Sequence, residues 1–183
     1  MSLVMTNGPS LEPVSLAEAK AHLRIDQADE DPLIQSLVIT SRLHIEAALG
    51  LALVTQGWSL FLDRWPKPGR ITLPLGPVTA LDAVRVWSDL TQFETLPVTD
   101  FYLDGAGHPP RLALLPAVST PQPQRPVNGI EIAFTAGYGG AADDVPAPIR
   151  HALLLLVAHW YENRKPVEIG SNATAIPAMV SEL

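Results

Sequence analysis

The spacing of apolar residues in the first fifty positions is helical. Ser15 and Glu18 form the S-x-x-E pattern of a capping box, and the apolar residues that follow predict a short helix from about Leu16 to Arg24. Next comes an acidic run, Asp29 to Asp31, and then an apolar stripe that continues to Gly50. Acidic side chains stabilise the positive end of a helix, so a second helix is expected there. The two helices together are predicted over positions 15 to 50.

From Leu53 onwards the period of the pattern changes from helical to two, and this alternation predicts strands. The expected strands are Trp58 to Leu62, Ile71 to Leu75, Ala83 to Trp87, Phe101 to Leu103, Arg111 to Leu115, and Ile130 to Thr135. Glycine, proline and aspartate mark the turns between them. The sequence therefore predicts a β region over residues 53–136, in which Pro74 favours a position at a sheet edge for its strand.

After Gly137 the helical period returns. A stretch that is apolar on most of its faces predicts a buried third helix over residues 145–164, with Asp144 as its expected N-cap. The order of the elements predicts an α+β fold: a helical core of two N-terminal helices and one C-terminal helix, with an inserted antiparallel β region. We expect a single domain over residues 1–165 and an extended tail or arm over residues 166–183.

The predicted C-terminal tail carries one apolar stripe. Four side chains, at spacings i, i+3, i+4 and i+7, lie on one face of a short helix: Ile176, Met179, Val180 and Leu183. A helix this short is marginal in water, so the stripe needs a surface to cover it. Two alternatives stay open at this point, because the tail can fold back on its own core or dock into a groove of a partner subunit. We take these four residues as the candidate partner interface.

Charge and composition exclude several classes of function. The chain of 183 residues has 12 Lys and Arg against 19 Asp and Glu, and the basic residues are scattered, so tight binding to nucleic acid is not expected. The absence of cysteine excludes disulfides and thiolate metal sites. The first ten residues lack a signal pattern, and the longest apolar run, Leu153 to Ala158, is far shorter than the roughly 20 residues of a membrane-spanning helix. We expect folding inside a cell and no membrane association.

The pattern offers little support for catalysis. There is no G-x-S-x-G elbow, and the glycines at 137, 139 and 140 lack the G-K-[ST] of a phosphate loop, so we interpret them as turn residues. His159 and Glu162 are three apart on the third predicted helix, and His151 is eight residues before His159. A metal-dependent enzyme using these three residues is one alternative. Because eight residues rotate His151 by about 80° from His159, we expect no metal, no cofactor and no catalytic residue.

Three stretches of the chain carry a family pattern. The first is P-V-S-L-A-E-A-K-x-x-L-R from Pro13, followed by D-x-L-I from Asp31, and the second is I-x-L-P-x-G-P-V from Ile71. The third is I-E-I-A-F-T-A-G-Y-G from Ile130, followed by V-P-x-x-I-R from Val145 and then L-L-L-V-A-H-W-Y-E-N-R. In this order and spacing the chain resembles the head-tail connector (adaptor) proteins of tailed phages and of phage-like gene transfer agents.

The resemblance implies a structural virion protein without a catalytic residue. It implies a homomeric ring, expected to be a dodecamer, beneath the portal protein, where it extends the DNA channel and provides the attachment surface for a tail or stopper protein. DNA would pass through without sequence-specific binding. The implied location is the virion neck, after assembly in the host cytoplasm. The end of the chain departs from the family, whose tails often finish in a longer basic helix. A different virion part, such as a tail-terminator protein, is the second alternative.

Overall fold

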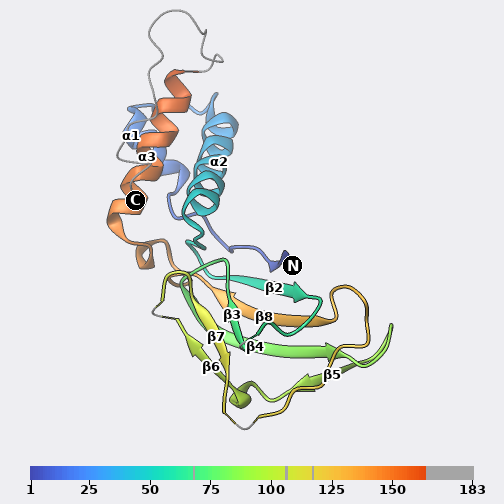
Figure 1. Cartoon of the computed structure of the whole chain (residues 1–183). Helices are drawn as coiled ribbons and strands as arrows, with labels where there is room; N and C mark the ends of the chain where they lie inside the picture. Colours follow the sequence, from blue (N-terminus) through green and yellow to red (C-terminus); the bar gives the residue numbers. More distant parts are fainter. Residues whose placement is uncertain (68, 106, 117, 164–183) are drawn as a thin grey trace, which may run out of the picture. The chain divides into compact units, whose positions relative to one another are not determined.

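A computed structural model describes residues 1–67, 69–105, 107–116 and 118–163. They form two compact units, which we call the helical unit (residues 11–49 and 141–163) and the β unit (residues 1–10 and 50–140) (Figure 1). The predicted α+β class is confirmed, since helices flank an inserted region of antiparallel strands in the chain. The single domain over residues 1–165 stays a prediction, and the predicted tail lies outside the described residues.

The helical unit contains α1 (Leu16–Leu23), α2 (Asp31–Leu49) and α3 (Ala147–Glu162). The predicted capping box begins α1: the Ser15 hydroxyl accepts a hydrogen bond from the Glu18 amide at 3.2 Å, and the Glu18 carboxylate accepts one from the Ser15 amide at 2.8 Å. Arg24, in the left-handed conformation with φ of 58°, ends the helix. The helix ends at Leu23, one residue before its predicted end at Arg24.

The core of the helical unit is built mainly from α2 and α3. Its fully or nearly fully buried apolar side chains are Val14, Ala19, Ile34, Val38, Ile45, Val145, Ile149, Ala152, Leu153, Leu156 and Val157. The prediction of a buried third helix is therefore confirmed. Its expected cap is wrong, because Pro146 is the N-cap residue and makes no side-chain cap bond. Asp144 lies in a short 3-10 turn, where its carboxylate accepts a hydrogen bond from the Ala141 amide at 2.9 Å.

The β unit consists of two antiparallel sheets. The five-stranded sheet has the order β1-β2-β8-β4-β5, and the three-stranded sheet has the order β3-β7-β6. The strands are β1 (Ser2–Asn7), β2 (Gln56–Leu62), β3 (Arg70–Thr72), β4 (Val78–Trp87), β5 (Phe93–Leu96), β6 (Phe101–Asp104), β7 (Arg111–Leu114) and β8 (Ile130–Ala136). All six predicted strands are present, and β3 is an edge strand as expected, although it ends at Thr72 and Pro74 lies beyond it. The strands β1 and β5 were not predicted.

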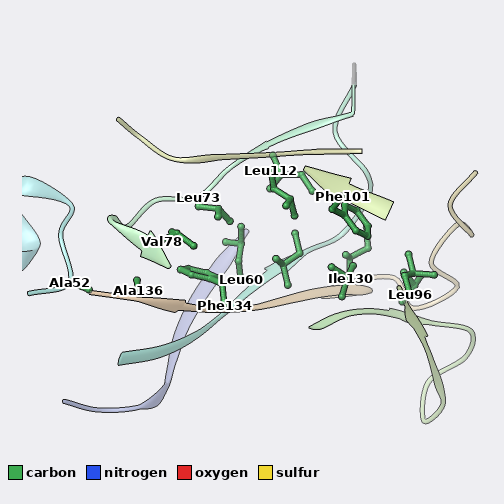
Figure 2. Packing of buried hydrophobic residues seen from close by; sticks show 14 residues of the cluster. Ala52, Leu60, Leu73, Val78, Leu96, Phe101, Leu112, Ile130, Phe134 and Ala136 are labelled. Atoms are coloured by element: carbon green, nitrogen blue, oxygen red, sulfur yellow. The ribbon is translucent and has the colours of Figure 1, made fainter. Parts of the chain in front are cut away.

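Apolar side chains of the two sheets form one shared core. Period-two alternation puts Ile132 of β8 on the same face of the sheet as its cross-strand partners Leu60 of β2 and Val84 of β4, and all three are fully buried. Phe134, two residues along β8, points to the same face and is also fully buried. Figure 2 shows Leu112 and Phe101 of the three-stranded sheet facing Leu60 and Ile130 of the five-stranded sheet. This burial stabilises the unit because each large apolar side chain removed from water contributes about 1.5–3 kcal/mol.

Candidate functional site

The three residues of the metal-enzyme alternative lie on α3 without converging on a common point. His151 packs edge-on against the ring of His22 at 6.3 Å, and the side chain of His159 lies beside Asn163. Among the residues that the structure describes, no group of three or more histidine, aspartate or glutamate side chains is arranged to hold a metal ion. Within the same residues, no helix combines the length and the apolar character needed to cross a membrane.

Arg150 connects the start of α3 to the start of α1. Its guanidinium donates to the carboxylates of Glu18 and Asp143, and its Nε donates to the Pro13 carbonyl oxygen at 3.1 Å. A guanidinium suits such a junction because its donors form a fixed, planar fork. The three partners lie 7 to 137 residues away in the sequence, so the contact fixes how two distant segments pack within the helical unit.

A second arginine is held almost entirely out of solvent. The side chain of Arg42 in α2 is 7% exposed, and it donates to Glu12 and to Glu46, both at 2.7 Å. Burial by itself lowers the pKa of this guanidinium, but the hydrogen bond to Glu12 and the charge of Glu46 raise the pKa above its ordinary value. Arg42 therefore stays charged inside the helical unit, and its two carboxylate partners compensate that charge.

Glu18 gives the helical unit a pH-dependent contact. Hydrogen bonds from the backbone and the hydroxyl of Ser15 lower the pKa of its carboxyl group, and Arg150 lowers it further. A group whose pKa falls on folding contributes stability above its unfolded pKa, and this contribution is lost as the pH drops through the folded value. For a glutamate the unfolded pKa is about 4.3.

We therefore expect Glu18→Gln to lower the stability of the helical unit at neutral pH and to have a much smaller effect below about pH 4. Glutamine can still complete an S-x-x-Q capping box, so the difference reports the charge rather than the cap. Urea unfolding followed by far-UV circular dichroism at the two pH values measures it. As a matched variant, Ser15→Ala removes the cap itself and is expected to cost about 1 kcal/mol. An equal effect of Glu18→Gln at both pH values would contradict the assignment.

The glycine cluster after β8 lets two backbone segments of the β unit approach closely. Gly137 has φ of +136°, and a Cβ atom there would lie 2.6 Å from the Thr55 amide nitrogen, so only glycine fits. The close approach allows the Tyr138 amide to donate to the Leu53 carbonyl oxygen at 3.1 Å, and the Thr55 amide to donate to that of Gly139 at 2.9 Å. Within the β unit these glycines hold the end of β8 against the segment before β2, which agrees with their interpretation as turn residues.

The outer face of the three-stranded sheet gathers residues that are far apart in the sequence. Cross-strand pairing puts Arg70, Ala113 and Tyr102 side by side in one row, and Arg111 with Asp104 in the next row of the same face. These five residues line a shallow depression, and we call it the arginine–tyrosine face. The Tyr102 residue is 62% exposed, and Arg111 pairs with Asp104 at 2.6 Å. Among the described residues Arg70 has no ion-pair partner.

The two units differ in charge. The described part of the helical unit has ten acidic and four basic residues, whereas the β unit has seven acidic and six basic residues. The negative net charge of the chain is thus concentrated in the helical unit. The sequence did not predict this separation, because the helical unit is made of two segments that a stretch of about ninety residues divides.

The helical unit also has a shallow groove along α1. It is lined by the apolar side chains of Leu16, Ala17, Ala21 and Ile25 and by the charged side chains of Lys20, Asp26 and Asp31. Lys20 and Asp31 neutralise each other through an ion pair at 2.6 Å, so among the described residues that line the groove Asp26 is the one without an ion-pair partner. We call this feature the α1 groove. The candidate interface of the sequence, Ile176, Met179, Val180 and Leu183, lies outside the described residues.

Comparisons with known proteins agree with the predicted resemblance. Residues 13–90 match the family model of the Phage gp6-like head-tail connector protein. The chain is also similar to a protein chain in the neck of an empty GTA particle computed with C6 symmetry, with a TM-score of 0.83 and 28% identity over 100% of this chain and 94% of that chain. The resemblance to head-tail connector proteins is confirmed. A comparison of this chain with curated protein sequences found no match.

Two further solved structures contain similar chains. One is the virion of a native gene transfer agent (GTA) particle, with a TM-score of 0.79 and 27% identity over 100% of this chain and 94% of that chain. The other is the neck of a native GTA particle computed with C12 symmetry. Its chain matches with a TM-score of 0.67 and 25% identity over 98% of this chain and 93% of that chain. Together the matches support a structural connector role in a virion neck rather than an enzymatic one. This agrees with what the family resemblance implied.

Proposed function

We propose that the chain forms a ring of twelve copies beneath a portal protein, where it extends the DNA channel and provides the attachment surface for a tail or stopper protein. The observation that carries this proposal is the similarity to chains of GTA necks over the whole length of this chain. The C12 symmetry of one of those necks supports twelve copies. Closed cyclic symmetry is also the common solution for an assembly of identical subunits.

The charge of the helical unit fits a channel component. DNA carries one negative charge per about 1.7 Å of duplex, and a wall rich in carboxylates does not retain it. In the described helical unit nine of the ten acidic residues are at least partly exposed, Glu46 being the buried one, and they give the unit such a surface. Sequence-specific binding is not part of the proposal, because DNA of any sequence must pass through the neck.

The proposal is tested by mixing the purified full chain with portal rings. We expect a ring stacked on the portal in negative-stain micrographs, and an increase in mass by light scattering that corresponds to twelve copies per portal. The free chain and the free portal are measured alongside as controls. If the chain stays separate from the portal and forms no ring, the proposed function is wrong.

The C-terminal stripe is the proposed docking element of this assembly. Ile176, Met179, Val180 and Leu183 would bury their side chains against the portal or a neighbouring copy. A chain that ends at Ala175 lacks all four and is expected to bind the portal at least tenfold more weakly, because each lost apolar contact contributes about 1 kcal/mol or more. Unchanged assembly of this truncated chain would remove the docking role and leave the ring proposal intact.

A further inference from the structure

Two surface features on different units of the chain have complementary chemistry. The arginine–tyrosine face presents the exposed side chain of Tyr102 in the same cross-strand row as Arg70, with Ala113 between them, and Arg70 has no ion-pair partner among the described residues. The α1 groove combines apolar lining residues with the exposed residue Asp26. A face with an exposed aromatic ring and a cation thus has its counterpart in a groove with apolar side chains and an anion.

We propose that the arginine–tyrosine face of one copy docks on the α1 groove of the next copy in the ring. This inference rests on the proposed function, because it assumes a cyclic homomeric assembly. In such a ring every copy uses two different surfaces, one for each neighbour, and the two surfaces must be complementary. The local charges meet that requirement, because the Asp26 carboxylate in the α1 groove of one copy can pair with the Arg70 guanidinium on the arginine–tyrosine face of another.

The composition of the two faces supports a protein partner over DNA for the arginine–tyrosine face. One of its two arginines, Arg111, is already neutralised by Asp104. The remaining cation, Arg70, shares its cross-strand row with the small side chain of Ala113 and, one strand further, the ring of Tyr102. Aromatic residues and arginine are enriched in protein interfaces, where the ring fills a pocket and the guanidinium pairs with a carboxylate. A phosphate-binding surface would instead present several uncompensated cations.

Crosslinking tests this contact directly, because the natural chain has no cysteine. The variant Ala113→Cys with Ala21→Cys places one thiol in each face and keeps every charged residue. We assemble this full-length variant on portal rings, treat it with a short bis-maleimide, and separate the products by denaturing electrophoresis. The expected result is a ladder of dimers, trimers and higher multimers. The control pair, Thr95→Cys with Ala21→Cys, moves the first thiol to the exposed strand β5 and is expected to give no ladder.

The outcomes separate this inference from the proposed function. Rings seen by microscopy without a ladder, or with a bridge inside a single copy only, overturn the inference and leave the ring proposal standing. A natural chain that forms no ring overturns both. An equal ladder from the control pair also overturns the inference, because the crosslinks would then be unspecific.

Charge reversal provides the second readout. Arg70→Glu sets a carboxylate against Asp26 of the neighbouring copy and is expected to weaken association between copies roughly tenfold or more, because like charges at an interface repel. Asp26→Arg alone has the same expected effect, and the two changes together restore association. If Arg70→Glu leaves the ring unchanged and instead alters retention of DNA in the particle, the face contacts DNA and the inference is wrong.

Discussion

Phe134→Ala is expected to lower the free energy of unfolding of the β unit by about 3–5 kcal/mol. Phe134 is 0% exposed and lies in β8, between β2 and β4 in the five-stranded sheet. Its ring packs in the core shared by the two sheets (Figure 2). Truncation to alanine leaves a cavity that a close-packed β core cannot fill by small movements. Because domains are stable by only about 5–15 kcal/mol, this loss is a large part of the total.

The measurement is urea unfolding followed by tryptophan fluorescence in a Trp160→Phe background. This background leaves Trp58, Trp65 and Trp87 as reporters, all in the β unit. The matched control is Phe93→Ala on the edge strand β5, where the phenylalanine is 50% exposed. Phe93 contacts Trp87 and Arg85, so its loss is expected to cost about 1 kcal/mol. A loss at Phe134 no larger than at Phe93 would contradict the described core.

Local signals made most of the fold predictable. The capping box at Ser15 and the acidic start of α2 depend on residues within one turn of each other, so the sequence shows them directly. Period-two alternation identified each strand that has one buried face. Strand β1 was missed because only Leu3 packs against the core, so no alternation is visible in its six residues. Strand β5 was missed because it has four residues and a single buried side chain, Leu96.

The assembly of the strands into sheets was not predictable from local patterns. Residue Gln56 pairs with Ala136, and Arg70 pairs with Ala113, so each sheet joins segments that are distant in the chain. The same pairing creates the arginine–tyrosine face from Arg70, Tyr102 and Arg111, which lie far apart in the sequence and share no local pattern. The family resemblance supplied the connector role, which neither composition nor spacing could provide.

Arg42→Met is expected to lower the free energy of unfolding of the helical unit by about 3 kcal/mol or more. The change removes the cation that compensates Glu46, and the side chain of Glu46 is 9% exposed. It also removes the hydrogen-bond donor to Glu12. A buried carboxylate that loses its counter-charge destabilises the folded state, because in the unfolded chain water solvates it fully. Urea unfolding followed by far-UV circular dichroism measures the loss, since the helices dominate that signal.

The double variant Arg42→Met with Glu46→Leu distinguishes the loss of a charge from the loss of packing. Replacing both members of a buried ion pair by apolar residues of similar volume is often neutral or stabilising. Glu12 is 25% exposed, so its carboxylate can turn to solvent when Arg42 is absent. We therefore expect the double variant to regain most of the stability that Arg42→Met loses. If the double variant is as unstable as the single one, the hydrogen-bond geometry and packing of Arg42 stabilise the unit more than the compensation of charge does.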